Sequence, residues 1–370
     1  MVVAGTRPEA VKVAPVVTEF RRHSEVATVM LNSGQHREMI RETLADFRLE
    51  PDVTLDVMEK DQSLAGLSSR LFTGVDSVLE AQKPDWIVLQ GDTTTVMISA
   101  LAAFYRGIRI AHIEAGLRSF DRKAPFPEEV NRQIVTRVAD LHFAPTRAAY
   151  ANLIREGIDP DSCFVTGNTV IDSLLQIQEQ IRGRDDLLDP RIRDAAAGGK
   201  RLILITGHRR ENFGRGFEDI CRAVLELSQR YPDCIFVYPV HLNPHVRNVV
   251  EPMLGGREGI LLLDPLPYLR FQATLNASYL VLTDSGGIQE EAPALNKPVL
   301  VMRDVTERPE GVKTGCARLV GSRTDSIVEG VSALLDDPEA YRAMARAQNP
   351  YGHGHAAARI VDAILRAGCP

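Results

Sequence analysis

Short apolar runs alternate with longer amphipathic stretches along the whole 370-residue chain. The runs have the length of buried strands, and the stretches between them carry helical patterns. This alternation predicts parallel sheets with helices on both faces, because parallel strands need crossover connections. The runs form two sets of about six, so we expect an α/β fold with two Rossmann-like, doubly wound domains. The expected strands are Met1–Ala4, Ala27–Leu31, Trp86–Gln90, Ile110–Ile113, Leu141–Ala144 and Cys163–Thr166, then Leu202–Thr206, Cys234–Val240, Ile260–Leu263, Leu280–Leu282, Val299–Met302 and Ala317–Val320.

The length of the chain also favours two domains, since 370 residues exceed what one ordinary hydrophobic core holds. The polar stretch Ile181–Lys200 contains Arg-Gly-Arg-Asp-Asp and Gly-Gly-Lys. We therefore expect the linker between the two domains within this stretch.

The composition is that of a globular protein, with 44% hydrophobic and 25% charged residues. The formal net charge of −6, without a basic stripe, gives no reason to expect nucleic acid as a partner. No apolar run reaches the roughly 18 residues that a membrane span needs, and no signal-peptide pattern is seen. Five cysteines without C-x-x-C spacing indicate buried free thiols in a reducing cytoplasm.

Ligands of parallel α/β sheets bind at the carboxyl ends of strands, so the residues after each strand are the candidates for function. After Leu280–Leu282 come Asp284, Ser285, Gly286 and Gly287, and then a helix. The free amides of a helix N-terminus bind phosphate well, and glycines allow close approach. The alternatives are a helix capped by Asp284 or Ser285, or simply a tight turn.

The loop after the first strand carries Glu9 as well as the cations Arg7 and Lys12. Thr6 and Glu9 have capping-box spacing, which favours a structural role for Glu9. Cations at a helix N-terminus are unfavourable unless an anion binds there, so Arg7 and Lys12 are ligand candidates. The loop lacks G-x-G-x-x-G, and we expect no bound dinucleotide cofactor.

Three carboxylates follow strands or begin helices in the first half of the chain. Asp92 comes after Trp86–Gln90, where a helix cap and a catalytic role are equally good explanations. Glu114 directly follows a strand expected to be central, which favours function. Glu128 begins a helix, where it either binds a ligand or merely offsets the helix dipole.

The second half supplies cationic candidates instead. His208 and Arg209 follow Leu202–Thr206 in a glycine-bounded loop, and guanidinium groups bind phosphate oxygens in pairs. Arg308 lies in a charged loop after another strand, where a ligand contact is favoured over a plain surface charge. His241 and the other histidines have no metal-ligand spacing, so we expect no metal. Acids in one half and phosphate-binding groups in the other fit cleavage of a glycosyl–phosphate bond in an interdomain cleft.

Eight blocks spread over the chain resemble the bacterial non-hydrolysing UDP-N-acetylglucosamine 2-epimerases. The blocks are Gly5–Ala10, Gln35–Met39, Gly91–Thr95, His112–Arg118, Thr166–Asp172, Gly207–Asn212, Tyr238–Pro244 and Thr283–Pro293. The resemblance implies two Rossmann-like domains of the glycosyltransferase-B type that face a central cleft, at residues 1–168 and 169–350. It also implies that residues 351–370 form a helix returning to the first domain, and that the protein is a homodimer.

The same resemblance implies reversible interconversion of UDP-GlcNAc and UDP-ManNAc, which supplies cell-surface polysaccharide synthesis. UDP would be eliminated to leave a 2-acetamidoglucal and then re-added with protonation on the other face of C2. Asp92, Glu114 and Glu128 would be acid/base residues, and His208 would act on the diphosphate or donate a proton. The UDP-binding residues would be Arg7, Lys12, Ser285, Gly286, Gly287, Glu291 and Arg308, with Glu291 on the ribose.

Some members of that family bind a second UDP-GlcNAc as an activator, with residues that match Gln35, His36, Gln62, Arg209 and His241. Where those members can show Gln and Arg, this chain has Glu38 and Asp61, and acids would repel a diphosphate. Three alternatives to a reversible epimerase stay open: a hydrolysing epimerase, a retaining glycosyltransferase of the same fold and a UDP-sugar-binding regulator.

Overall fold

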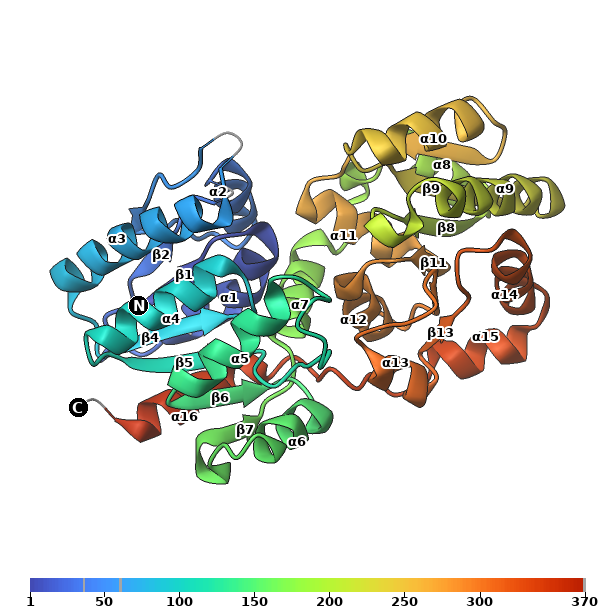
Figure 1. The fold of residues 1–370 in the computed structure, drawn as a ribbon. Coiled ribbons are helices and arrows are strands. Elements are labelled where there is room, and N and C mark those ends of the chain that lie inside the picture. The colour runs from blue at the N-terminus through green and yellow to red at the C-terminus, as the bar shows by residue number, and fades with distance from the viewer. Residues whose placement is uncertain (36, 60–61, 369–370) are drawn as a thin grey trace. The chain divides into compact units, whose positions relative to one another are not determined.

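The computed structural model describes residues 1–35, 37–59 and 62–368, and the chain forms two compact units (Figure 1). Unit 1 comprises Met1–Gln176 and Tyr351–Pro370, and unit 2 comprises Ile177–Pro350. Residues 169–176, which the sequence analysis assigned to the second domain, lie in unit 1. They belong there because their helix is tied to it, for example by the Ser173 hydroxyl, which donates to the Val11 carbonyl.

The described part of unit 1 contains a seven-stranded parallel sheet in the order β3-β2-β1-β4-β5-β6-β7. Its central strands are short and apolar, and their side chains are buried on both faces, as a helix-covered parallel sheet requires. The strands are β1 (Val2–Ala4), β2 (Met30–Asn32), β3 (Val53–Thr54), β4 (Trp86–Gln90), β5 (Arg109–Ile113), β6 (Leu141–Ala144) and β7 (Cys163–Val165).

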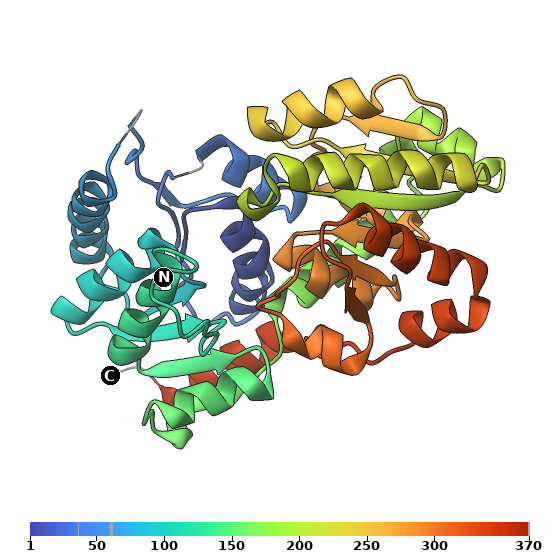
Figure 2. The ribbon, with the colours of Figure 1, turned by 45° about the vertical axis from the view of Figure 1, so that its right-hand side comes forward.

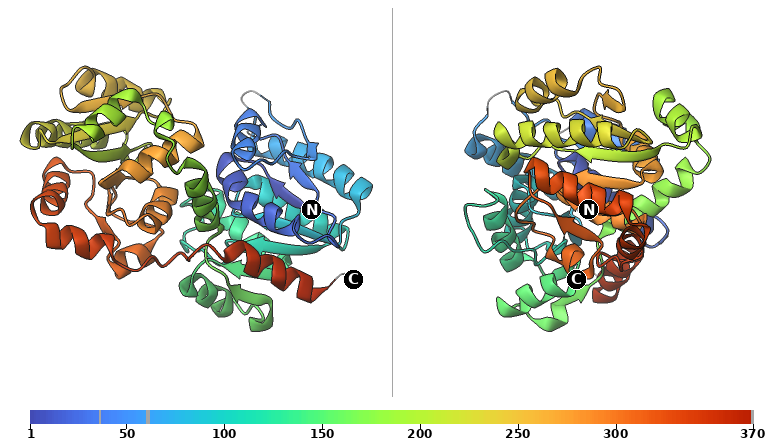
Figure 3. Two further views of the ribbon diagram at one scale, coloured as in Figure 1. Left: turned by 180° about the vertical axis from the view of Figure 1, so that it is seen from behind. Right: turned by 90° about the vertical axis from the view of Figure 1, so that its right-hand side faces the viewer.

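Helices cover this sheet on both faces. Val75, Leu79, Val96, Ala100 and Val135 from α3, α4 and α5 are buried against strand residues on one face. The last helix, α16, packs against α1 (Figure 3). The helices of unit 1 are α1 (Arg7–Phe20), α2 (Arg37–Asp46), α3 (Leu64–Gln82), α4 (Thr94–Tyr105), α5 (Glu128–Val138), α6 (Arg147–Arg155), α7 (Thr169–Ile181), which continues into unit 2, and α16 (Ala356–Ala367).

Unit 2 repeats the architecture with a six-stranded parallel sheet, among its described residues, in the order β10-β9-β8-β11-β12-β13. The strands are β8 (Arg201–Thr206), β9 (Cys234–Pro239), β10 (Ile260–Leu263), β11 (Leu280–Thr283), β12 (Val299–Val301) and β13 (Ala317–Leu319).

On one face of this sheet α9 packs between α10 and α14, while α8, α11, α12 and α13 carry side chains of the opposite core (Figure 2). The helices are α8 (Pro190–Ala197), α9 (Arg215–Arg230), α10 (Pro244–Leu254), α11 (Tyr268–Ala277), α12 (Gly286–Ala294), α13 (Pro309–Thr314), α14 (Thr324–Asp336) and α15 (Pro338–Ala345).

Two expectations about the chain's course were wrong. The sequence missed β3, which has two residues that are not buried and therefore gives no apolar run. The stretch Ile181–Lys200 is not the linker, since it lies within unit 2 and contains α8. Asp189 caps α8, and Ile192 is buried in the core, so this polar segment packs on its own domain.

The strand order places a switch point in each sheet, between β1 and β4 in unit 1 and between β8 and β11 in unit 2. The chain winds outward in opposite directions from these pairs, so the loops at their carboxyl ends separate and expose backbone to a ligand. The loops at these points begin at Gly5, Gly91, Gly207 and Asp284.

No helix among the described residues has both the length and the apolar character needed to cross a membrane. Cys163, Cys221, Cys234 and Cys316 are buried free thiols, as the sequence predicted; Cys369 lies outside the described residues.

Candidate functional site

The structure brings Asp92 and Glu114 to the carboxyl ends of adjacent strands of unit 1. Strand β4 ends at Gln90, paired in register with Ile113 at the end of β5. Glu114 has a φ of 66°, in the left-handed region that a side chain other than glycine rarely adopts. An unfavourable backbone angle at a buried carboxylate is typical of a residue held in place for function.

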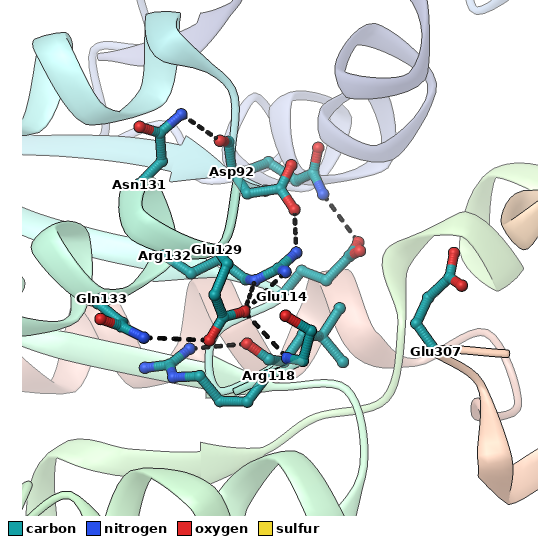
Figure 4. Close-up of polar contacts among 12 residues, drawn as sticks. Asp92, Glu114, Arg118, Glu129, Asn131, Arg132, Gln133 and Glu307 are labelled. Atoms are coloured by element: carbon teal, nitrogen blue, oxygen red, sulfur yellow. Dashed lines mark hydrogen bonds and ion pairs between the residues drawn. The ribbon is translucent and has the colours of Figure 1, made fainter. Parts of the chain in front are cut away.

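Glu114, which Figure 4 shows near Asp92, accepts hydrogen bonds from the side chains of Lys12 on α1, Gln90 on β4 and Asn168 just before α7. Its Oε2 atom lies 2.8 Å from Nε2 of Gln90 and 3.5 Å from Nδ2 of Asn168, and it forms an ion pair with Lys12. The side chains of Glu114 and Lys12 are only 8% and 11% exposed. Burial removes most of the hydration of the Glu114 carboxylate, and the ion pair with Lys12 offsets this loss.

Asp92 is held from helix α5 (Figure 4). Its Oδ2 atom lies 2.5 Å from a terminal nitrogen of Arg132, and its carbonyl accepts from Asn131 at 2.8 Å. Burial raises the pKa of Asp92, and the charges of Glu114 and Glu128 raise it further, whereas Arg132 and Lys12 lower it. The raised pKa makes the protonated form of Asp92 more accessible, as a general acid requires.

The explanation of Asp92 as a helix cap is wrong. Helix α4 begins at Thr94, and the cap residue is Thr93, whose hydroxyl accepts from the amide of Val96 at 3.4 Å. The Asp92 side chain is therefore available for its contact with Arg132.

Glu128 is the first residue of α5, as the sequence suggested. Its neighbour Glu129 makes the structural contacts. The Glu129 carboxylate accepts from the Ser119 amide at 2.9 Å and pairs with Arg132 at 2.8 Å. Among the described residues, the Oε2 atom of Glu128 is buried and has no hydrogen-bond partner. Because Glu128 also raises the pKa of Asp92, it belongs electrostatically to the same cluster.

Glu9 has the structural role that its spacing predicted. Its carboxylate accepts from the amides of Gly5 and Thr6 and completes a capping box at the start of α1. Burial raises the pKa of Glu9 to about 7, and the charge of Asp92 adds to this effect. Glu9 thus titrates close enough to Asp92 for the charge of Asp92 to affect it.

Replacing Glu9 by Gln is expected to make stability less dependent on pH. The pKa of Glu9 is 4.5 when unperturbed and about 7 when folded, so its stabilising contribution is complete below pH 4.5 and lost as the pH rises through 7. The unfolding free energy of Glu9→Gln relative to the parent should rise by about 3 kcal/mol between pH 4 and pH 8 in urea titrations. Glu19→Gln, on the same helix, is the control; an unchanging difference for Glu9→Gln across this range would contradict the prediction.

In unit 2, the buried carboxylate of Asp284 organises the loop after β8. It accepts from the amides of His208 at 3.0 Å and Arg209 at 2.9 Å, and from the side chain of Asn212 at 3.2 Å. Asp284 is therefore not a cap of α12, which was one of the alternatives. It joins the two loops at the switch point and fixes the direction of the His208 side chain.

His208 lies with its Nδ1 atom 3.4 Å from Asp284 and its ring stacked on His241, at 5.6 Å between ring centroids. Burial lowers the pKa of His208, although Asp284 acts in the opposite direction. The imidazole is accordingly neutral at pH 7, so it can donate one hydrogen bond and accept another.

The N-terminus of α12 begins with Gly286 and Gly287, and Ser285 is its cap residue. The Ser285 side chain makes no capping hydrogen bond, and its amide donates to the Thr283 hydroxyl at 2.9 Å. A Cβ atom on Gly286 would lie 3.0 Å from Glu307 and 3.4 Å from Arg308. Glycine thus lets these charged groups approach the first amides of the helix, which point outward with the positive end of its dipole.

The remaining expected UDP-binding residues divide between the units. Glu291 is buried on α12 and accepts from Gln272, while Arg308 binds Glu290 at 2.9 Å between Nε and Oε1. Both lie in unit 2 with Ser285, Gly286 and Gly287. Arg7 and Lys12 are on α1 of unit 1, and Lys12 contacts Glu114.

The residues matched to an activator site also divide. Gln35 accepts from the Thr95 hydroxyl at 3.0 Å, and Gln62 accepts from Arg70, both in unit 1. Arg209 and His241 lie in unit 2, where Arg209 is 3.2 Å from Glu307. Glu38 is exposed on α2, whereas His36 and Asp61 lie outside the described residues.

Several side chains that complete these clusters were missed by the sequence analysis. Gln90 is the last residue of β4, and Asn168 follows β7 by three residues. Both positions lie at the carboxyl ends of strands, so the rule that selected the other candidates could have found them. Arg132 lies four residues after Glu128, on the same helix face. Arg303 and Glu307 lie in the charged loop after β12 that the sequence indicated, but they were not named individually. Asn212 has no local signal.

Comparison with known proteins places this geometry in a family. Residues 18–365 match the family model described as UDP-N-acetylglucosamine 2-epimerase. A protein of Ralstonia solanacearum named probable UDP-N-acetylglucosamine 2-epimerase is 48% identical over 370 residues, which cover 98% of each chain.

Solved structures of similar proteins point to the same family. The UDP-GlcNAc 2-epimerase of Neisseria meningitidis, bound to UDP-GlcNAc, is 43% identical with a TM-score of 0.92 and covers 99% of both chains. The Methanocaldococcus jannaschii UDP-GlcNAc 2-epimerase, in complex with UDP-GlcNAc and UDP, is 31% identical with a TM-score of 0.83 and the same coverage. The expected fold class, two Rossmann-like domains of the glycosyltransferase-B type, is confirmed. The chain belongs to the UDP-N-acetylglucosamine 2-epimerase family.

Proposed function

We propose that this protein is a non-hydrolysing epimerase that reversibly interconverts UDP-GlcNAc and UDP-ManNAc. The observation that carries the proposal is the pair of carboxylates, half-buried Asp92 and buried Glu114, fixed by cations at adjacent strand ends. Family membership supplies the substrate class, since relatives are named for this activity and two were solved with UDP-GlcNAc.

The proposed reaction is an elimination followed by an addition. A carboxylate takes the proton from C2 while the C1–O bond breaks, so that UDP leaves with the bonding electrons and 2-acetamidoglucal forms. UDP then adds back to C1, and C2 receives a proton on the opposite face. No external oxidant or water is consumed. After one turnover the acceptor carboxylate holds the proton from C2 and the donor carboxylate has lost one, and both regain their initial protonation states by proton exchange with solvent. Direct deprotonation without departure of UDP would be far slower, because C2–H is not acidic.

The acid/base set in unit 1 comprises Asp92, Glu114 and Glu128. Lys12 stabilises the charged form of Glu114, which suits a proton acceptor, whereas the raised pKa of Asp92 suits a proton donor. The charges of Glu114 and Glu128 raise the pKa of Asp92 and thereby favour its protonated form. The cluster therefore contains both a donor and an acceptor, as an inversion at C2 requires.

Unit 2 supplies the groups for the leaving diphosphate. The first amides of α12 and the Arg308 guanidinium stabilise negative charge on UDP, and the neutral imidazole of His208 donates a hydrogen bond to it. Glu291 would accept hydrogen bonds from the ribose hydroxyls. Arg7 and Lys12 extend the cationic set from unit 1.

We further propose the wider context that the family resemblance implied. The protein would work without a cofactor or metal, as a cytoplasmic homodimer that supplies cell-surface polysaccharide synthesis. A second UDP-GlcNAc would act as an activator through Gln35, His36, Gln62, Arg209 and His241, with Glu38 and Asp61 weakening its binding.

Proton NMR of UDP-GlcNAc incubated with the purified protein in D2O tests the proposed function. We expect deuterium at C2 of the sugar and a new anomeric signal from UDP-ManNAc, with UDP-sugar conserved. Steady accumulation of free UDP and N-acetylmannosamine would instead indicate a hydrolysing epimerase. Turnover only with an added acceptor would indicate a glycosyltransferase, and absence of both exchange and turnover would favour a binding protein.

A further inference from the structure

Glu307 places a carboxylate among the groups that were assigned to the diphosphate. Its Oε1 atom lies 3.2 Å from Arg209 and 3.4 Å from Arg308, and its Oε2 atom lies 2.6 Å from Arg303. The same Oε1 atom lies 3.0 Å from the point that a Cβ atom on Gly286 would occupy. Glu307 is thus beside the N-terminus of α12, on the side where Arg209 and Arg308 converge.

This carboxylate is ionised at every physiological pH. Burial acts to raise its pKa, but Arg308, Arg303 and Arg209 together outweigh burial and lower the pKa of Glu307 to about 2. An ionised carboxylate at a helix N-terminus and among guanidinium groups satisfies the same electrostatic requirements as a phosphate oxygen. The protein therefore carries its own anion at this position.

We propose that Glu307 is an internal competitor of the diphosphate, which limits the affinity for UDP and so determines how readily the nucleotide-sugar leaves. The inference rests on the proposed function, since the reaction requires UDP to be held tightly while the glycal exists and the product to be released afterwards. A diphosphate that binds Arg209 and Arg308 has to share them with Glu307 or displace it. Both outcomes weaken ground-state binding through repulsion between like charges.

Two of the three arginines, Arg303 and Arg308, do not depend on Glu307 alone. Arg303 is bound by Glu211, and Arg308 is bound by Glu290. Removing the charge of Glu307 consequently leaves these two cations with a carboxylate partner. The opposite role, a brace that holds the arginines ready for the ligand, would predict weaker UDP binding when Glu307 is replaced.

Titration calorimetry of the full-length protein with UDP and with inorganic pyrophosphate separates the two roles. Glu307→Gln keeps the shape of the side chain and removes its charge, so we expect about tenfold tighter binding of both probes. Glu211→Gln is the matched control. Glu211 also binds Arg303, but it is not among the three groups nearest to a Cβ atom on Gly286, which are Glu307, Arg308 and Arg209. This control should change affinity less than threefold, and equal or weaker UDP binding by Glu307→Gln would overturn the proposal.

Kinetics provide a readout that a purely structural role would not give. Glu307→Gln should lower KM for UDP-GlcNAc without raising kcat, because the gain concerns the ground state. If this variant does not fold, Glu307→Asp serves instead, because the shorter side chain moves the carboxylate away from Arg209 and Arg308 by one methylene group. UDP should bind to it more tightly than to the parent, and weaker binding would overturn the proposal. A parent that binds UDP without epimerising in D2O would contradict the proposed function separately, whatever the variants bind.

Discussion

Replacing Asp92 by Asn is expected to lower kcat for epimerisation about 1,000-fold, the usual contribution of a positioned acid or base. Asn keeps the size of the side chain and can still accept from Arg132, which now lies 2.5 Å from Asp92. It cannot exchange a proton, so incorporation of deuterium at C2 should fall by the same factor. UDP affinity should stay within about threefold, because Asp92 is not among the residues assigned to UDP binding.

Asp76→Asn is a suitable control for this prediction. Asp76 also pairs with an arginine, Arg106, in unit 1, but it joins two helices on the surface. Its replacement should leave kcat within twofold. Retention of more than one-tenth of the parental kcat by Asp92→Asn, with the thermal unfolding profile preserved, would remove Asp92 from the acid/base set.

The fold was predictable because its strongest signals are local. Buried parallel strands are apolar on both faces, so β4, β6 and β10 appear in the sequence as runs with the boundaries that the structure has. Apart from β3, which was missed, the other strands differ only at their ends, as for β2, expected at Ala27–Leu31 and observed at Met30–Asn32. Strand order is not local, and the switch points became visible only when the strands were paired.

The errors have a common cause, which is that polarity was read as exposure or as a break in structure. Ile181–Lys200 is rich in charge, yet Ile192 anchors α8 in the core of unit 2. One well-placed apolar residue per helix turn is enough to pack a polar helix, and composition averages hide it.

Candidate site residues were predictable from strand ends, but their partners were not. Asp92 and Glu114 follow strands and are close together because β4 and β5 are neighbours. Arg132 and Asn168 reach them from positions far along the chain, through contacts that depend on tertiary packing. Lys12 was predicted to bind an anionic ligand because it lies near a helix N-terminus, whereas the structure pairs it with the carboxylate of Glu114.

The motif from Asp284 to Gly287 shows the same limit most clearly. Its glycines and its strand-to-helix position predicted a phosphate site, and the resemblance assigned Ser285, Gly286 and Gly287 to it. The side chain of Asp284 faces away from its own helix and towards the loop after β8. The carboxylate of this apparent anion site is thereby occupied by amide donors, and it positions the loop that carries His208 and Arg209.

Asp284→Asn is expected to weaken UDP binding about 30-fold and to lower the unfolding free energy by about 2 kcal/mol. Asp284 is completely buried and accepts from two amides and one side-chain amide, and hydrogen bonds to a charged acceptor contribute about 1.5–3 kcal/mol. Asn presents an NH2 group to some of these donors, so the loop that carries His208 and Arg209 should lose its anchor. Calorimetry with UDP and urea titration measure the two effects.

Hydrogen exchange decides whether the loss of affinity arises in this way. The amides of His208 and Arg209 should lose protection in Asp284→Asn, while amides in the centre of β8 keep theirs. Asp264→Asn is the control, because Asp264 binds Arg247 at the surface of the same unit and should leave protection and affinity unchanged. If stability falls while UDP binds as tightly as before, Asp284 supports the fold alone, and the groups that hold the diphosphate do not depend on the position of this loop.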